Sequence, residues 1–391
     1  QGEALAADPG GGRIGEGHVI DLYLEHRIAL PPRAPVPEPP PEPPAVAQHG
    51  AMTAAAPHPP AAGAGAPATV KPTLQLLLTA ACWAALLLGG PAIRAEPGPL
   101  PAFRLAGVAL EESSLRFAPR GGLERPAVIE VEGLLANPLG RYYLYYSAHR
   151  HAGIGLAYAD SLDGPWTDYA GNPLIRDVAI PDVLWIGESG RLHLWAHGRN
   201  SQSDLWTSSD GLEFRHHSTS IRASTINTRN ATYTRTYVHP LERFGSRYVM
   251  LYSGLIKTSG IRAIWLAHSD DGTTWTQLPA PLLEPAPEET REIYDPALLS
   301  LGNRTFITYQ DASAHRGGSI RYVEVDRELH PIGSAGKRTV LLDAEPGPPL
   351  NGRFRGTQVL RDGERLVLFS GASVKPGVII YATAELSPTL E

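Results

Sequence analysis

The sequence has almost no cysteine, since Cys82 is the only one among 391 residues. A chain with one cysteine cannot form an internal disulfide, so its fold depends on a large buried core. The sequence has no H-E-x-x-H segment and no cluster of cysteine and histidine, so nothing in it indicates a zinc site. It also has no G-x-S-x-G elbow after a strand, which disfavours a serine hydrolase.

Strong charge of one sign is also missing. The formal net charge is −6 and 42% of the residues are hydrophobic, which is typical of a globular protein. This mild acidity gives no reason to expect nucleic acid or an anionic membrane surface as a partner. No long amphipathic helical stretch follows residue 100, so an all-β fold is expected there. Nothing in the sequence indicates an oligomeric state.

The first hundred residues differ in kind from the rest, because they hold 18 of the 37 prolines. Residues 1–51 include the run PPRAPVPEPPPEPP, which predicts a disordered or linker-like segment. The first methionine is Met52, so translation from upstream of a native start is an alternative interpretation of residues 1–51.

Residues 52–95 are typical of a targeting segment. An apolar run, TLQLLLTAACWAALLLGG, is followed by small residues before Glu96, which predicts a cleavable signal peptide cut after Ala95. We therefore expect a secreted, periplasmic or extracellular protein. An uncleaved membrane anchor is the alternative, because residues 73–90 approach the roughly 18 apolar residues that can span a bilayer.

Residues 100–391 contain a repeat of four short predicted strands. Its first copy, in residues 125–166, contains RPAVIEVEG, GRYYLYYSAH and GIGLAYADSLDGPW, and the alternation in YYLYYS places successive side chains on opposite faces of a strand. The second strands of the five copies begin at Tyr142, Leu192, Tyr248, Thr305 and Leu366. A period of roughly 50 to 60 residues with this pattern predicts a five-bladed β-propeller of four-stranded antiparallel sheets.

Two local features help to assign this repeat. The segment FRLAGVALEESSLRF, before the first copy, is either the outer strand that completes the last blade or an N-terminal cap. Asp-Gly pairs recur at Asp163-Gly164, Asp210-Gly211, Asp271-Gly272 and Asp362-Gly363. Because glycine accepts a positive φ, these pairs are typical of hairpin turns and have no expected chemical role.

The succession RPAVI, GRYYLYYSAH, GIGLAYADSLDGPW and PDV followed by GRLHLWAHG resembles the five-bladed glycoside hydrolases of families 43 and 62 and the related families 32 and 68. The resemblance covers about residues 105–388. It implies an active site on the propeller axis with three carboxylates: a base in a DP pair of the first blade, a pKa modulator in a PDV motif of the second, and an acid in an EGP motif of the third. Asp182, in IPDV, matches the modulator.

The other two motif positions depart from this pattern. The first blade reads Arg125-Pro126 in place of DP, and the third reads Val238-His239-Pro240 in place of EGP. The fourth blade has a DP pair, Asp295-Pro296, and Glu124-Arg125-Pro126 has the spacing of the acid motif. Our hypothesis is a displaced set of catalytic residues: Asp182 and Asp295, with His239 or Glu124 as the acid. The alternatives are a turn role for Asp295, a structural role for His239 and a solvated charge at Glu124.

Further residues are candidates for substrate binding. Arg125, Arg235 and Arg355 suit a carboxylate or phosphate, which keeps a uronic-acid substrate and a phosphorolytic reaction open, although each also suits a neighbouring carboxylate. His149 follows the second strand of the first blade, where loops reach the rim of the pocket or the surface. Trp185 and Tyr294 either stack on a sugar ring or belong to the core. No cofactor or metal ligand set is predicted, although an axial calcium ion is compatible with such propellers.

The sequence thus predicts a secreted glycoside hydrolase that acts on a polysaccharide or oligosaccharide. A non-catalytic carbohydrate-binding propeller and a glycoside phosphorylase are the alternatives.

Overall fold

The computed structural model describes residues 100–117, 122–147, 153–198, 202–223, 228, 230–289, 292–312, 318–332, 338–343, 349, 354–372 and 376–386. The predicted linker (1–51) and the predicted signal peptide or anchor (52–95) lie outside these residues. Within them the strands form five four-stranded antiparallel sheets, which confirms the predicted five-bladed propeller. Among the described residues no helix is long and apolar enough to cross a membrane.

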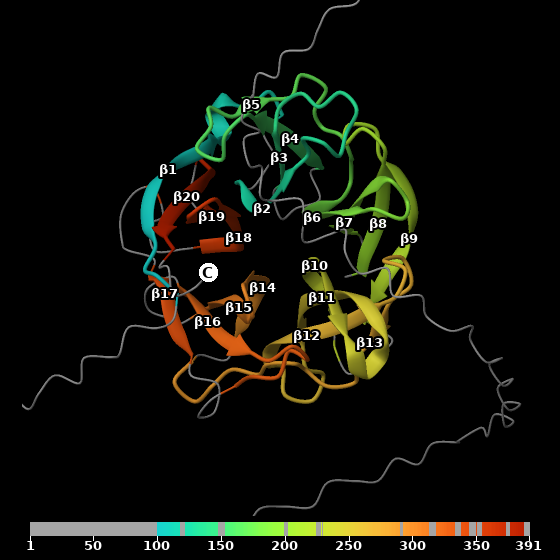
Figure 1. Cartoon of the computed structure of the whole chain (residues 1–391), viewed down its shortest axis with the longest axis vertical. Coiled ribbons are helices and arrows are strands. Elements are labelled where there is room, and N and C mark those ends of the chain that lie inside the picture. The colour runs from blue at the N-terminus through green and yellow to red at the C-terminus, as the bar shows by residue number, and fades with distance from the viewer. Residues whose placement is uncertain are drawn as a thin grey trace, which may run out of the picture. The chain divides into compact units, whose positions relative to one another are not determined.

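Four blades are built from consecutive strands, each with its first strand nearest the axis (Figure 1). Blade 1 contains β2 (Glu124–Glu130), β3 (Tyr142–Ser147), β4 (Ile154–Ala159) and β5 (Thr167–Asp168). Blade 2 contains β6 (Ala179–Ile186), β7 (Arg191–His197), β8 (Gln202–Ser208) and β9 (Arg215–Arg222). Blade 3 contains β10 (Thr232–Leu241), β11 (Ser246–Leu255), β12 (Arg262–Ser269) and β13 (Thr276–Gln277). Blade 4 contains β14 (Ile293–Leu301), β15 (Arg304–Asp311), β16 (Ser319–Val325) and β17 (Thr339–Asp343).

Blade 5 joins strands from the two ends of the propeller sequence. It contains β18 (Phe354–Asp362), β19 (Arg365–Ala372) and β20 (Val378–Glu385), and its outer strand is β1 (Arg104–Glu111). Strand β1 pairs antiparallel with β20. In Figure 1 the cyan strand β1 lies beside the red strand β20. The segment FRLAGVALEESSLRF therefore supplies a closing strand, one of the two predictions. Short 3-10 helices follow β1 and β10 (Glu112–Ser114 and Glu242–Phe244).

The hydrophobic core is divided into five clusters, one between each pair of neighbouring blades. Strand β3 shows how one strand serves two of them: Tyr143 and Tyr145 face blade 2, whereas Tyr142, Leu144 and Tyr146 face blade 5. Both faces of the strand are buried because successive side chains point to opposite sides. The inner strands β2, β6, β10, β14 and β18 contact one another in turn and β18 contacts β2, which closes the ring.

Each inner strand has an irregularity in its hydrogen-bond register near its N-terminal end. Pairing with the second strand is interrupted at the same place in every blade. In each interruption one residue has a positive φ: Arg125 (50°), Ile180 (59°), Tyr233 (60°), Asp295 (52°) and Gly356 (72°). We call these five residues the axial ring. A positive φ is uncommon for residues other than glycine and is costly for a β-branched residue such as Ile180. Four such residues in equivalent places therefore indicate a functional constraint.

The residue after each member of the axial ring is proline or threonine. Pro126, Pro181 and Pro296 follow in blades 1, 2 and 4, and Thr234 and Thr357 follow in blades 3 and 5. These residues lie in the interrupted part of the ladder, where no backbone N–H is needed for pairing, so proline fits there although it is excluded from regular inner strands.

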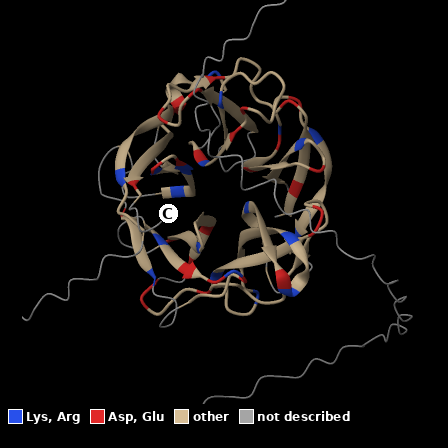
Figure 2. Cartoon of the chain, in the orientation of Figure 1, with Lys and Arg blue, Asp and Glu red and all other residues tan. Residues whose placement is uncertain are grey.

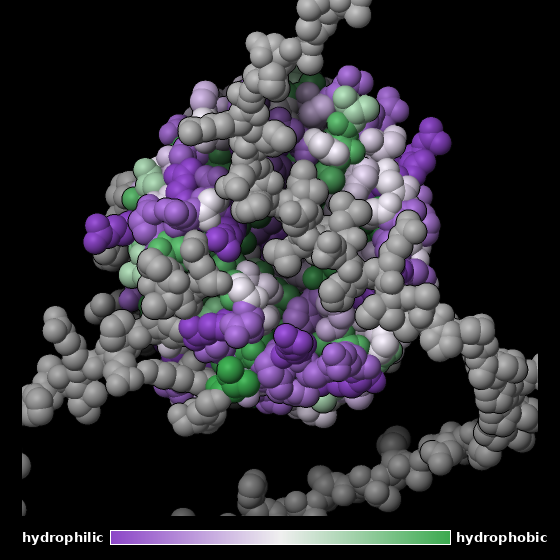
Figure 3. Space-filling view, in the orientation of Figure 1, coloured by the Kyte–Doolittle hydropathy of each residue, from purple (hydrophilic) through white to green (hydrophobic). Residues whose placement is uncertain are grey.

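Charged residues of both signs lie next to one another at the axial ends of the inner strands (Figure 2). The rest of the visible described surface is mostly hydrophilic, with hydrophobic residues in small separate groups (Figure 3). The charged groups at the axis differ from these surface charges because Arg125, Asp182, Arg235 and Asp295 are buried.

Candidate active site

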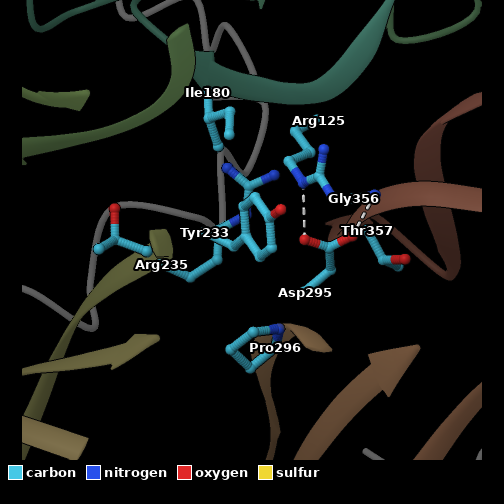
Figure 4. Close-up of a pocket in the computed structure, with 9 residues that line it drawn as sticks. Arg125, Ile180, Tyr233, Arg235, Asp295, Pro296, Gly356 and Thr357 are labelled. Carbon is cyan, nitrogen blue, oxygen red and sulfur yellow. Dashed lines mark hydrogen bonds and ion pairs between the residues drawn. The ribbon is translucent and has the colours of Figure 1, made fainter. Parts of the chain in front are cut away.

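The axial ring surrounds a small cavity (Figure 4). All five members line it, together with Arg235, Pro296 and the two threonines that follow ring residues. Its volume is about 10 Å³, close to what one water-sized group requires. Tyr233 is the only lining residue that is not fully buried, so it marks the mouth of the cavity.

Arg125 and Asp295 point toward each other across this cavity from blades 1 and 4 (Figure 4). Arg125 Nε donates to Asp295 Oδ1 over 2.7 Å, and the Gly356 amide donates to Asp295 Oδ2 over 2.9 Å. The Asp295 amide donates to Ser253 Oγ over 3.1 Å, which satisfies a buried N–H at the irregular position. Both carboxylate oxygens of Asp295 are therefore used within the protein.

Arg125 also contacts Glu124 and Tyr233. Its Nη1 lies 2.5 Å from Glu124 Oε2, and its guanidinium carbon lies 3.8 Å from the centre of the Tyr233 ring. Burial alone would lower the pKa of Arg125, but the charge of Asp295 raises this pKa above its ordinary value. The arginine is thus held as a cation on the axis by two carboxylates and an aromatic face.

Arg235 joins three blades beside this pair. Its side chain starts in blade 3, and its guanidinium donates to the carbonyl oxygens of Pro181 in blade 2 (3.2 Å) and Pro126 in blade 1 (2.6 Å). Arg235 Nη1 also lies 3.7 Å from Asp182 Oδ1. The orientation of Arg235 is therefore determined by the backbone of the two neighbouring inner strands.

Asp182 is a buried carboxyl group beside Arg235. It is 4% exposed, and its Oδ2 has no hydrogen-bond partner among the described residues. Burial raises the pKa of Asp182 to about 6, although the Arg235 charge opposes this shift. A carboxyl group with this pKa exchanges its proton near neutral pH, as a general acid must.

The structure brings most of the predicted site residues together near the axis. Arg125 contacts Glu124 and Asp295. Arg235 contacts Asp182, and both arginines line the cavity. Arg355 Nε lies 3.9 Å from Glu124 Oε1, and the Tyr294 ring lies 6.4 Å from the Tyr233 ring. Burial raises the pKa of Tyr294 to about 12. The arginines pair with neighbouring carboxylates, which was one of their two predicted roles.

Of the predicted site residues, Arg125, Arg235 and Asp295 line this cavity, whereas Asp182, Glu124, Tyr294 and Arg355 lie beside it. The other three are not placed there. His239 lies in the second half of β10 and donates from Nε2 to the Arg327 carbonyl in blade 4 over 2.8 Å. Trp185 packs against the core cluster between blades 1 and 2, which was its alternative role. His149 lies outside the described residues.

Blade 3 begins earlier than the motif spacing predicts. Val238-His239-Pro240 occupies the expected place of the third motif, whereas β10 begins at Thr232 and its ring residue is Tyr233. Sequence reasoning also missed Gly356 and Thr357 as lining residues. One signal was present in the sequence: the X-Pro pairs of blades 1, 2 and 4 mark the ring positions, and counting along each blade leads to Thr234 and Thr357.

The lining of the cavity does not suit a calcium ion. Calcium takes six to eight oxygen ligands, whereas Arg125 and Arg235 present guanidinium groups here and both oxygens of Asp295 are already bound. In the described part of the chain no group of three or more histidine, cysteine, aspartate or glutamate residues is arranged to hold a metal ion.

No protein family model and no curated protein matches this chain. Solved structures do match. The complex of BT0996 with RGII has a TM-score of 0.55 and 13% identity, covering 74% of this protein and 94% of that one. An α-L-arabinofuranosidase from Podospora anserina in complex with cellotriose has a TM-score of 0.51 and 12% identity, covering 73% and 98%.

A thermostable family-43 glycoside hydrolase also matches, with a TM-score of 0.50 and 16% identity over 68% of this protein and 90% of that one. At these identities the likeness shows the fold, which is the five-bladed propeller found in glycoside hydrolases of this group. The matched structures do not assign catalytic residues in this chain.

Proposed function

We propose that this protein is a glycoside hydrolase that cleaves a polysaccharide or oligosaccharide near the propeller axis, beside the axial cavity. The shared fold supports a carbohydrate substrate, and the neighbours in complex with RGII and cellotriose are carbohydrate-bound propellers. The chemistry must come from this chain's own residues, because fold alone does not determine function.

The observation on which the proposal depends is a pair of buried carboxyl groups in different environments. Asp182 has a pKa of about 6 and a carboxyl oxygen without a partner among the described residues. Both oxygens of Asp295 accept hydrogen bonds, one from a guanidinium and one from an amide. Glycoside hydrolysis needs one protonated carboxyl group and one carboxylate, and different surroundings separate these roles.

In this proposal Asp182 donates its proton to the leaving oxygen as the glycosidic C–O bond breaks. Asp295 accepts a proton from a water molecule, whose oxygen forms the new bond to the sugar carbon. Arg235 contacts Asp182 and lines the cavity that Asp295 lines, so it connects the two groups. Glu124 is paired with Arg125, and His239 is bound to the Arg327 carbonyl, so neither is assigned the acid role.

The test is the substitution of each aspartate by asparagine. Asp182→Asn and Asp295→Asn should each reduce product release from a polysaccharide panel by about 100-fold or more. Asp204→Asn is the matched control, because Asp204 is a buried aspartate of β8, the third strand of blade 2, and is hydrogen-bonded to Thr219 away from the inner strands. Released sugars are measured by chromatography, at a temperature where circular dichroism shows all variants folded. Wild-type rates in both axial variants would remove these residues from the mechanism.

A non-catalytic carbohydrate-binding propeller is the second candidate. It is favoured by Arg125, which occupies the position where the resemblance implies a catalytic base. Glycan binding by the wild type without product on the whole panel would support this candidate against hydrolysis.

Secretion is a separate proposal, and residues 52–95 are its only support. Expression of the full chain with N-terminal sequencing of the exported protein tests it: a new N-terminus at Glu96 is expected, and retention of the whole segment in the membrane would indicate the anchor.

A further inference from the structure

The wall of the axial cavity has hydrogen-bond donors and few acceptors. Arg125 and Thr357 are 2% and 1% exposed, and both line the cavity. Arg125 Nη2 and Thr357 Oγ1 are buried atoms without a hydrogen-bond partner among the described residues. A buried guanidinium N–H without a partner is costly, so such a group in a cavity wall indicates a ligand atom that completes it.

The contacts of the other two guanidinium nitrogens of Arg125 explain why Nη2 has no partner among the described residues. Nε donates to Asp295 and Nη1 to Glu124. Asp295 does not form a bidentate pair with Nε and Nη2 of Arg125, because its second oxygen accepts a hydrogen bond from the Gly356 amide. The neighbouring Arg235 donates to two backbone carbonyls. Both oxygens of Asp295, the carboxylate that lines the cavity, are therefore used, and the acceptor for Nη2 has to come from a ligand.

The position of Arg125 is fixed by close packing against Gly356 and Tyr233. A Cβ on residue 356 would lie 2.5 Å from the Arg125 Cα, so only glycine at that ring position leaves room for the arginine. The Tyr233 ring covers one face of the guanidinium. An arginine held this rigidly loses little conformational entropy when it binds a ligand.

We propose that the axial cavity receives one oxygen of a carboxylate, so that the sugar bound by this protein is a uronic acid; this inference rests on the proposed carbohydrate function. The cavity of about 10 Å³ accepts one oxygen atom. A sugar carboxylate inserts one oxygen while its ring stays at the mouth beside Tyr233. A free phosphate can also insert one oxygen, but it has no sugar ring to pack beside Tyr233 at the mouth.

Binding of defined oligosaccharides to the full chain tests this inference. The probes are an oligogalacturonide, its methyl ester, a neutral galactan oligosaccharide and inorganic phosphate, measured by isothermal titration calorimetry. The wild type should bind the acid at least about tenfold more tightly than the methyl ester, because an acceptor with a full charge strengthens the bond to the guanidinium. Phosphate should not displace the acid.

Thr357→Val and Thr232→Val form a matched pair. Both threonines have a buried hydroxyl without a partner among the described residues, but only Thr357 lines the cavity. Thr357→Val should weaken binding of the acid about tenfold, whereas Thr232→Val should leave it unchanged. Equal effects of the two substitutions would contradict the inference.

The results separate this inference from the hydrolase proposal. A preference for the acid form without any product would support the carboxylate site and reject hydrolysis. Turnover of neutral glycans with no preference for the acid over its ester would support hydrolysis and overturn the carboxylate site. Displacement of the acid by inorganic phosphate would assign the cavity to phosphate and also overturn the inference.

Discussion

The axial ring and the Asp-Gly turns between the third and fourth strands of blades 1, 2 and 3 are two sets of equivalent positions. They differ in whether the same side chain recurs from blade to blade. In two turns the same contacts recur: Asp210 Oδ1 accepts from two following amides at 2.9 Å, and Asp271 Oδ1 does so at 2.7 Å. The axial ring repeats only its backbone conformation, and each blade contributes a different side chain there.

This difference separates the turn residues, which stabilise the fold locally, from the axial-ring residues, whose side chains differ between blades. In blades 2 and 3 the turn aspartate satisfies the backbone of its own turn, so the same residue type serves both blades. The ring residues instead contact one another across the axis, as Arg125 contacts both Asp295 and Gly356. Positions that are equivalent in the fold but unlike in sequence are therefore the positions to examine for function in a repeat protein.

The largest contrast should come from two glycines with positive φ. Gly356→Ala should lower the free energy of unfolding by about 3 kcal/mol or more, since the new methyl group overlaps Arg125 and the backbone is strained. Gly363→Ala, in a turn where nothing lies within 4 Å of the new Cβ, should cost only about 1 kcal/mol. Urea denaturation measures both, and equal losses would show that the ring is no more tightly packed than the turns.

A smaller effect should come from the pH dependence of Asp182. Its folded-state pKa of about 6 lies above the ordinary 3.8, so the native state binds this proton more tightly than the unfolded state. This contribution is complete below about pH 4 and is lost as the pH rises through 6. The stability of Asp182→Asn relative to the wild type should therefore rise by roughly 1 to 3 kcal/mol between pH 4 and 7. A constant difference across this range would contradict the assigned pKa.

The smallest effect should come from Asp271 in its turn. Backbone amides and a serine hydroxyl hold the pKa of Asp271 at about 2, against the opposing effect of burial. Asp271→Ala should lower the free energy of unfolding by about 1 kcal/mol, because the residue is exposed and its lost bonds are local. Activity and glycan binding should be unchanged. A loss of binding in this variant would remove the distinction between the turns and the ring.

The number and order of the blades could be predicted from the sequence because they depend on local patterns. The predicted second strands, for example at Tyr142 and Leu366, begin within one or two residues of β3 and β19. The alternation in YYLYYS indicated a strand with successive side chains on opposite faces, and the structure shows that both faces are buried. Turn glycines and period-2 alternation act within a few residues, so a single sequence shows them.

The candidate site was only partly predictable, because it depends on contacts between distant blades. The pairing of Arg125 with Asp295 joins blades 1 and 4 and has no local signal. The start of blade 3 was misplaced because Tyr233 adopts a positive φ without glycine or a following proline. Asp182 was identified by its motif, but its raised pKa follows from burial beside Arg235, which only the folded ring produces.

The pairing of β1 with β20 has a consequence for synthesis on the ribosome. Residues 104–111 emerge from the ribosome long before their partner, residues 378–385. The backbone of β1 therefore stays unpaired along this edge until the other four blades have been synthesised. The last strand to leave the ribosome is thus the one that shields the earliest, and a nascent chain that stalls before residue 378 exposes a strand ready to join another molecule.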